Sequence, residues 1–244
     1  MLKSFQPYNN VAITNTSFPS STPPHRSEII TTSAYVLPSF KYIPFLPRVS
    51  FDSVQALVKG YLLPKKLNAA HDKLSPIHRD RLTRSETSRE FLPGARDVKD
   101  ILVLICGHGG RDMRCGITGP ILQAEFEKTL QGQEIKVEKE AVEIREGDKD
   151  DVPRLESGGS TIARVGLISH IGGHKFAGNV IIYIPPNAET KDGPPHPFRG
   201  CGIWYGRVEP KHVDGIVRET IMGGKVIEEL FRGGIAQDGE ILRL

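Results

Sequence analysis

The chain has 244 residues, of which 38% are hydrophobic, 25% charged and 7% aromatic, and its net charge is +3. It is long enough to bury a core, and so mild a charge without a basic patch argues against nucleic acid as a partner. Its three cysteines are too few for a disulfide framework, and no apolar run approaches the roughly 20 residues that span a bilayer. We therefore expect neither membrane insertion nor a nucleic-acid partner.

The first part of the chain combines β-rich runs with one amphipathic helix. Asn10–Thr14 and Thr32–Phe45 are apolar runs of the composition found in strands. In Ser50–Leu63 the apolar residues recur at helical spacing, and either Ser50 or Asp52 is placed to cap the helix.

A second globular region follows a linker over residues 64–99, where charge dominates and periodicity is lost. Ile101–Ile105 is an unbroken aliphatic run, typical of a strand buried on both faces. After a glycine-rich loop, a helix is predicted to begin at Gly119-Pro120 and to end near Leu130. Proline is favourable at the first helical position.

The remaining elements complete an α/β pattern. Glu134–Gly159 is predicted to be an acidic excursion. Three strands are predicted after it, over Arg164–Ser169, Asn179–Ile184 and Gly202–Val208. Two helical segments close the region, over Pro210–Met222 and Lys225–Phe231, and Gly233-Gly234 ends it. This order fits a thioredoxin-like layer of helices on a small mixed sheet. Residues 235–244 are then expected to form a C-terminal tail.

Four residues of the second region indicate a metal site. Cys106 and Cys115 close the glycine-rich loop CGHGGRDMRC, and His170 and His174 flank a Gly-Gly turn in HIGGHKFAGN. Two thiolates and two imidazoles are the ligand set of a tetrahedral zinc site or of an iron–sulfur cluster with mixed ligands.

Other residues near this motif have weaker claims. His108 is a competing ligand inside the cysteine loop, whereas Cys201 is expected to pack beside a strand or to remain free. Arg111 and Arg114 are candidates to surround a cluster and favour its reduced state, with Asp112 between them. An equally weighted alternative is that the arginines form ion pairs with Asp112 and hold the loop.

The motifs also resemble those of a known family. CGHGGRDMRCG, HIGGHKFAGN and GIWYGRV resemble the sucrase/ferredoxin-like family of thioredoxin-like ferredoxins, and SAYVLPSFKYIPFLPRVSFDSVQALVKGYLLP and LSPIHRDRL resemble its fungal branch, which is named for altered inheritance of mitochondria. The resemblance implies a thioredoxin-like ferredoxin domain over residues 100–234 with a [2Fe–2S] cluster. By the same resemblance, Cys106 and Cys115 bind one iron, and His170 and His174 the other.

The resemblance further implies an electron carrier, rather than a substrate-converting enzyme, that serves an unknown redox partner protein. A mitochondrial location is implied, with the cytosol as the alternative because no targeting signal is evident. Members of the family carry a cysteine-containing segment ahead of the part matched here. Residues 1–63 are therefore expected to be a partial thioredoxin-like region. Either the gene model is truncated, or this member has lost half of that domain.

Three other functions remain open at this stage. The four ligands suit a zinc-binding structural module, although eight residues between the cysteines exceed the spacing usual in structural zinc loops. Cys106 and Cys115 would also suit a thiol–disulfide oxidoreductase, although that chemistry normally uses Cys-x-x-Cys. A scaffold that binds a partner through its N-terminal part is the third.

Overall fold

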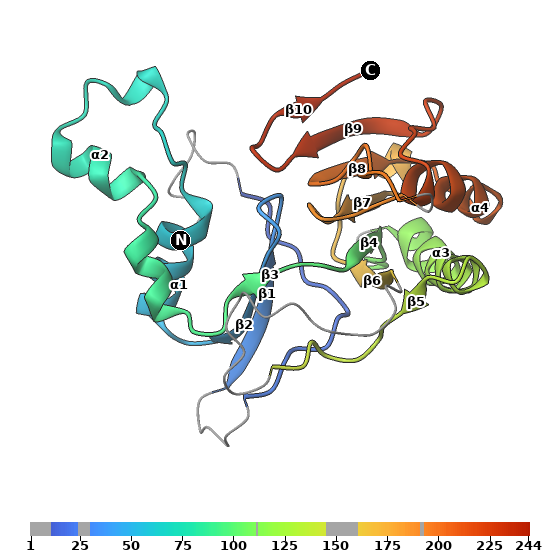
Figure 1. The fold of residues 1–244 in the computed structure, drawn as a ribbon, viewed down its shortest axis with the longest axis horizontal. Helices are drawn as coiled ribbons and strands as arrows, with labels where there is room; N and C mark the ends of the chain where they lie inside the picture. Colours follow the sequence, from blue (N-terminus) through green and yellow to red (C-terminus); the bar gives the residue numbers. More distant parts are fainter. Residues whose placement is uncertain (1–10, 24–29, 111, 145–160, 191–192) are drawn as a thin grey trace.

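The computed structural model describes residues 11–23, 30–110, 112–144, 161–190 and 193–244, which form two β-sheets (Figure 1). The smaller sheet has the strand order β1-β2-β3 and the larger one the order β10-β9-β8-β7-β4-β6-β5. The smaller sheet is antiparallel and consists of β1 (Thr31–Val36), β2 (Lys41–Pro47) and β3 (Arg96–Asp97).

The N-terminal predictions are confirmed in part. The β-rich run from residue 32 to 45 is the β1–β2 hairpin, and the predicted helix is α1 (Phe51–Leu57), continued by a π-helical turn over Val58–Leu62. Ser50 is the cap, because its side chain accepts a hydrogen bond from the Ser53 N–H. Asn10 lies outside the described residues, and residues 11–14 form no strand. Just after them, Thr16 forms an isolated bridge with Ile168.

The charged segment after residue 63 contains short helices rather than extended linker alone. They are a 3-10 turn over Ala69–His71, α2 over Pro76–Leu82 and a longer 3-10 segment over Glu86–Phe91. None of the residues of α2 is buried, as expected for a solvated segment.

The larger sheet carries the predicted thioredoxin-like core. Its strands are β4 (Ile101–Cys106), β5 (Lys136–Val137), β6 (Ile162–Ile168), β7 (Val180–Ile184), β8 (Cys201–Tyr205), β9 (Phe231–Ala236) and β10 (Ile241–Leu242). β4 is parallel to β6 and antiparallel to β7, and β7 is antiparallel to β8. The order β6-β4-β7-β8 with these directions is that of a thioredoxin-like fold, so the predicted α/β class is confirmed.

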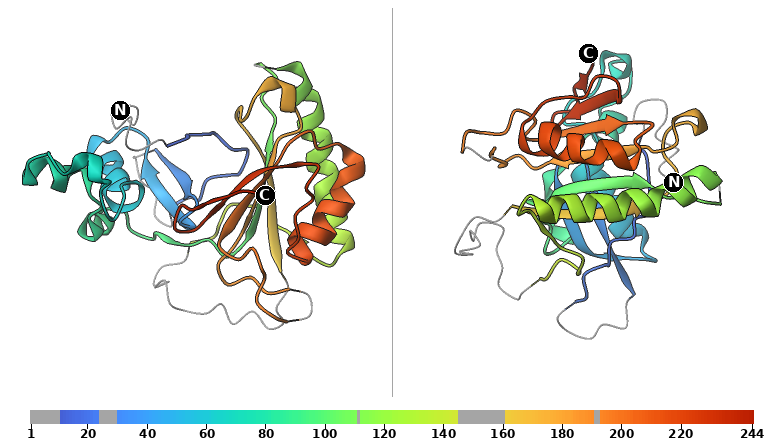
Figure 2. Two further views of the ribbon diagram at one scale, coloured as in Figure 1. Left: turned by 90° about the horizontal axis from the view of Figure 1, so that it is seen from above. Right: turned by 90° about the vertical axis from the view of Figure 1, so that its right-hand side faces the viewer.

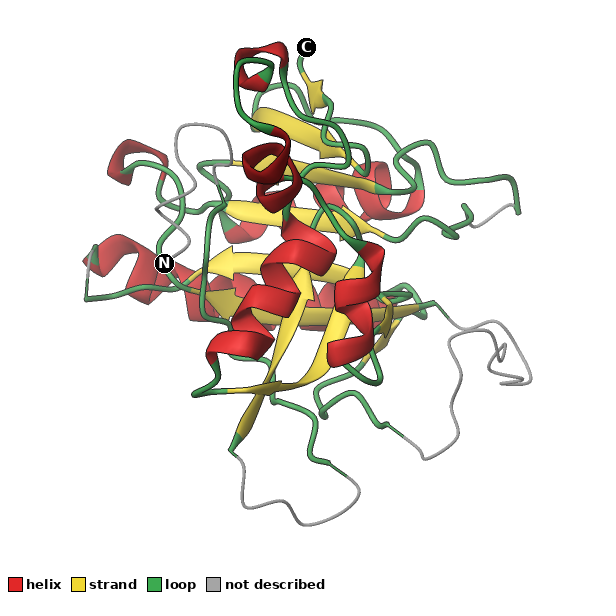
Figure 3. Cartoon of the chain, turned by 90° about the vertical axis from the view of Figure 1, so that its left-hand side faces the viewer, coloured by secondary structure: helices red, strands yellow, loops and turns green. Residues whose placement is uncertain are grey.

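Helices cover one face of this sheet and the N-terminal region covers the other (Figure 2). The helical face carries α3 (Met113–Gly132) and, on the same side, a helix that passes from a 3-10 turn (Pro210–His212) through α4 (Val213–Gly215) to π-helical turns (Ile216–Met222). Figure 3 shows the opposite side, where the helices of the N-terminal region lie in front of the strands.

The core between α3 and the sheet fixes the position of the helix. Val103 and Ile105 of β4 pack with Leu122, Phe126 and Leu130, whose spacing of four residues keeps them on one side of α3. All five are buried, and each contributes roughly 1.5–3 kcal/mol to the free energy of unfolding. This packing anchors the helix that carries Cys115 to the strand that ends in Cys106.

The start of α3 differs from the prediction. The helix begins at Met113, six residues before the predicted start at Gly119, so Cys115 lies in its first turn and not in a loop. Asp112 caps the helix by accepting a hydrogen bond from the Arg114 N–H at 2.9 Å. Pro120 therefore lies inside the helix, where it removes one hydrogen bond. The cap and the burial of Cys115 in the first turn offset that loss.

The C-terminal region also differs from the prediction. No helix forms over 225–231, and Gly233-Gly234 lies within β9 rather than ending the domain. β10 then pairs with β9, so the predicted tail over residues 235–244 supplies an edge strand. The exposed edge of β8 stabilises β9 through backbone hydrogen bonds, which the glycine-rich sequence of β9 does not reveal. The division of the chain into domains stays a prediction.

Among the described residues, none of the helices combines the length and the apolar character that crossing a bilayer requires.

Candidate metal centre

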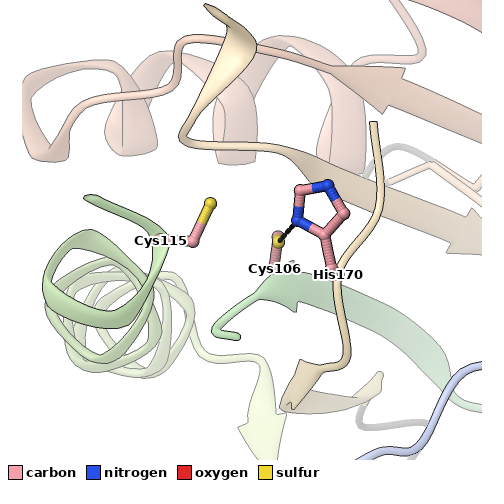
Figure 4. A group of neighbouring side chains, drawn as sticks. All are labelled: Cys106, Cys115 and His170. Carbon is pink, nitrogen blue, oxygen red and sulfur yellow. Dashed lines mark hydrogen bonds between the residues drawn. The ribbon is translucent and has the colours of Figure 1, made fainter. Parts of the chain in front are cut away.

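Three of the predicted ligands converge from three different elements. Cys106 ends β4, Cys115 lies in the first turn of α3, and His170 follows β6 (Figure 4). Since β4 and β6 are parallel, their carboxyl ends meet at one edge of the sheet. The ligand atoms of the three residues lie within 4.8 Å of one another, and the distance from Cys106 Sγ to His170 Nδ1 is 3.9 Å.

The other predicted residues fall into two groups. The backbone of His174 begins a 3-10 turn over His174–Phe176, but its side chain lies outside the described part of the chain, as does all of Arg111. His108 is exposed and is not among the three converging residues. Cys201 lies at the opposite end of β8 from the site, where it packs partly against the core, as predicted.

Two glycines of α3 let the helix approach the cysteine loop. A Cβ on Gly116 would lie 2.6 Å from the Cα of Gly109, and a Cβ on Gly119 would lie 2.9 Å from the backbone oxygen of Cys106. Both contacts are with backbone atoms, which no side-chain rotation relieves. Glycine at these positions therefore brings the first turns of α3, and Cys115 with them, against the end of β4.

Asp112 and Arg114 hold the start of α3. The Arg114 guanidinium forms an ion pair with the Asp112 carboxylate at 2.9 Å, and that carboxylate also caps the helix. Of the two roles left open for these residues, the structure shows the ion pair. The Asp112 side chain is 8% exposed, whereas that of Arg114 is 61% exposed.

The two thiols are buried and interact with each other. Burial first, and then the hydrogen bond with the neighbouring Cys106 and the charge of Cys106, raise the pKa of Cys115 to about 11. A hydrogen bond from the backbone of Gly178 acts in the opposite direction. Cys115 is therefore a neutral thiol near pH 7 in the absence of metal, and a bound cation would displace its proton.

A buried amide lies beside the cysteines. The Cys106 N–H donates to the backbone oxygen of Asn179 at 3.0 Å, so Asn179, directly before β7, lies opposite the end of β4. Asn179 Oδ1 accepts from Trp204 Nε1 at 3.2 Å and from Arg232 Nη1 at 2.9 Å. Tryptophan and arginine can only donate, so these bonds fix which end of the amide is oxygen.

The other end of this amide has no partner. Asn179 is fully buried, and its Nδ2 has no hydrogen-bond acceptor within the described residues. The amide also packs against the histidine loop, because a Cβ on Gly172 would lie 2.6 Å from Asn179 Oδ1. The amide that carries this unpaired donor thus lies between the strand of Cys106 and the loop that follows His170.

Sequence reasoning did not single out Gly178, Asn179, Trp204 or Arg232. The available signal was the position of Gly178-Asn179, directly after the histidine loop and directly before a buried strand. Trp204 and Arg232 come from β8 and β9, so that only the sheet pairing brings them to the site.

Comparison with known proteins identifies the family of the chain. The model of the sucrase/ferredoxin-like family matches residues 2–233. The chain belongs to this family. Relatives named "Altered inheritance of mitochondria protein 32" occur in Debaryomyces hansenii, with 31% identity over 96% of this chain, in Meyerozyma guilliermondii, with 29% over 92%, and in Clavispora lusitaniae, with 36% over 72%. These names link the family to mitochondria.

The matched part covers 69%, 63% and 50% of the lengths of these three relatives. Among solved structures, the thioredoxin-like [2Fe–2S] ferredoxin from Aquifex aeolicus is similar over 55% of this chain and 97% of that chain, with 18% identity and a TM-score of 0.31.

Proposed function

We propose that the protein is an electron carrier that holds a [2Fe–2S] cluster through Cys106, Cys115, His170 and His174. The observation that carries the proposal is the convergence of two buried Sγ atoms and an imidazole nitrogen within 4.8 Å. Thiolates and imidazoles are the ligands of clusters with mixed ligation. Of the four residues, His174 is assigned from the sequence motif.

The unpaired Asn179 Nδ2 supports a cluster beside the cysteines. A buried N–H donor without an acceptor costs roughly 1–3 kcal/mol, so native proteins rarely leave one. The sulfides and thiolates of a cluster accept hydrogen bonds, and such bonds raise its reduction potential. The bond from Gly178 to Cys115 supplies a second donor from the adjacent residue.

When bound, such a cluster takes up and releases one electron. Two ferric ions, two sulfides and two thiolates sum to zero charge with neutral imidazoles, so one added electron leaves a single negative charge. Burial of Cys106 and Cys115 makes each negative charge costly, so a cluster that starts at zero charge suits this site. The N–H groups of residues 178 and 179 favour the single negative charge that reduction adds.

The geometry of the site is compatible with zinc binding but argues against thiol–disulfide exchange. A compact group of three ligand atoms would also suit a single zinc ion, so zinc is the second candidate. Thiol–disulfide exchange needs an accessible thiolate of low pKa. Cys106 and Cys115 are both 1% exposed and burial raises the pKa of Cys115, which argues against that chemistry.

The names of the relatives support a mitochondrial location for this protein. We place its electron transfer there, with a redox protein as the partner.

The test is anaerobic purification followed by analysis of iron, acid-labile sulfide and zinc, together with a visible spectrum. We expect about two irons and two sulfides per chain. Cys106→Ser and Cys115→Ser should lose them, whereas Cys201→Ser should keep them because Cys201 lies at the far end of β8. Stoichiometric zinc without sulfide would overturn the proposal in favour of a zinc module.

A further inference from the structure

Three cations gather around one aromatic ring beside the candidate metal centre. Lys175 Nζ and Arg207 Cζ each lie 5.0 Å from the centroid of the Phe176 ring, and Arg232 Cζ lies 3.6 Å from it. Each contact of a cation with the ring face is favourable on its own, but three like charges around one ring repel one another. We call Lys175, Arg207 and Arg232 the cationic surface.

No carboxylate of the described residues forms an ion pair with any of the three cations. Burial and the nearby Arg207 charge both lower the pKa of Arg232, so the cations destabilise each other's charge. The cations of the neighbouring helical segment behave differently, since they form pairs: Lys211 with Glu209, Arg218 with Asp214 and Lys225 with Glu219. Within the described part of the chain, the cationic surface is thus left without a compensating carboxylate.

The backbone of Arg207 is strained where it holds this cation beside Phe176. Its φ of +58° lies in the left-handed region, which favours glycine and is unfavourable for a side chain as large as arginine. A hydrogen bond from the Arg207 N–H to the Phe176 carbonyl, at 3.4 Å, joins this position to the histidine loop. An exposed arginine is therefore kept beside Phe176 despite the strain.

The cationic surface adjoins the candidate ligands. Phe176 lies two residues after His174, and Arg232 donates to Asn179, the residue opposite Cys106. A Cβ on Gly172 would lie 2.9 Å from Arg232 Nη1, so Arg232 also contacts the loop that follows His170. Any molecule seated on the cationic surface lies next to the metal centre.

We propose that Lys175, Arg207 and Arg232 form the docking surface for an acidic one-electron redox protein, an inference that rests on the proposed function. Carboxylates of the partner pair with the three cations and supply the missing negative charge. One electron then passes between the partner and the centre held by this chain, one being oxidised as the other is reduced, and no bond forms or breaks. Charge complementarity of this kind also steers the encounter.

The test uses the holoprotein, after its iron and sulfide have been measured. The reduced protein is mixed in stopped flow with anionic ferricyanide or cationic hexaammineruthenium(III), each of which takes one electron, over a range of salt concentrations. With wild type, the rate with ferricyanide should fall as salt rises, while the rate with the ruthenium complex should not fall. The double variant Lys175→Gln/Arg207→Gln should react about tenfold more slowly with ferricyanide at low salt and lose the salt dependence.

Lys99→Gln is the control for a positive charge removed away from the centre, because it removes one of the two units of charge that the double variant loses, just before β4, at the end opposite Cys106. It should leave both rates unchanged. Poly-L-glutamate should slow the ferricyanide reaction of wild type at concentrations where inorganic phosphate of equal charge does not, and should have no effect on the double variant.

The outcomes are distinguishable. A wild-type protein without iron and sulfide overturns the proposed function and this inference together. A loaded protein whose ferricyanide rate is the same in wild type and double variant overturns the inference alone. Equal inhibition by phosphate and poly-L-glutamate would mean that the cationic surface binds a small anion, and would also overturn the partner assignment.

Discussion

Two substitutions at Asn179 separate the role of its amide oxygen from that of its nitrogen. Asn179→Leu removes both, so Trp204 Nε1 and Arg232 Nη1 lose their acceptor. A neutral hydrogen bond contributes about 0.5–1.5 kcal/mol and one from a charged donor about 1.5–3 kcal/mol. Both donors belong to partly exposed residues that regain water, and Asn179→Asp also lacks the unpaired N–H. We therefore expect Asn179→Leu to be less stable than Asn179→Asp by about 2 kcal/mol in the cluster-free chain.

Asn179→Asp keeps an acceptor and replaces only the unpaired nitrogen. It removes a buried N–H whose isolation costs roughly 1–3 kcal/mol, and the new carboxylate lies where Arg232 Nη1 approaches to 2.9 Å. The pairing offsets the burial of charge. The unfolding free energy of the cluster-free chain should therefore stay within about 1 kcal/mol of wild type, or rise.

In the cluster-loaded protein, both variants should shift the reduction potential in the same direction, because both lack the N–H donor of Asn179. Their reduction potentials should lie below that of wild type, with Asn179→Asp the lower because of its charge. Urea unfolding of the cluster-free chains and potentiometric titration of the reconstituted proteins measure the two effects. Trp204→Phe is the control, since it weakens the oxygen side and should leave the potential unchanged. A wild-type potential in Asn179→Leu would refute the reasoning.

Three further predictions concern the scaffold. Gly116→Ala should separate α3 from the cysteine loop and reduce iron content, whereas Gly132→Ala in the same helix meets no atom within 4 Å and should leave iron content unchanged, as metal analysis of the two variants would show. Burial lowers the pKa of His196, so the folded state binds fewer protons than the unfolded state and stability should fall as pH drops below about 6.5, by at most about 1.4 kcal/mol per pH unit. His196→Gln should flatten that part of the profile in urea unfolding at pH 5.5 and 7.5. Phe126→Ala should cost about 3–5 kcal/mol by leaving a cavity in the core under α3, and an unchanged urea midpoint would contradict the packing described here.

The sequence by itself determined the central strand and most of the site. An unbroken aliphatic run needs no tertiary information to be recognised as a buried strand, and a cysteine at its end and a histidine after the next parallel strand must then meet at one sheet edge. Ser50 capped its helix as one of the two candidates, because a cap is a contact between residues three apart. Local chemistry was sufficient for these features.

Tertiary structure alone decided the rest, because the deciding contacts join segments distant in the sequence. α3 begins at Met113 rather than Gly119 because the packing of Gly116 on the backbone of Gly109 adds to the Asp112 cap and the burial of Cys115, and together they outweigh the loss caused by Pro120. The glycine-rich β9 becomes a strand because the edge of β8 offers it backbone partners, as no local pattern could show. The orientation of the Asn179 amide and the gathering of cations around Phe176 depend in the same way on residues from β8, β9 and the histidine loop, which meet only when the sheet has formed.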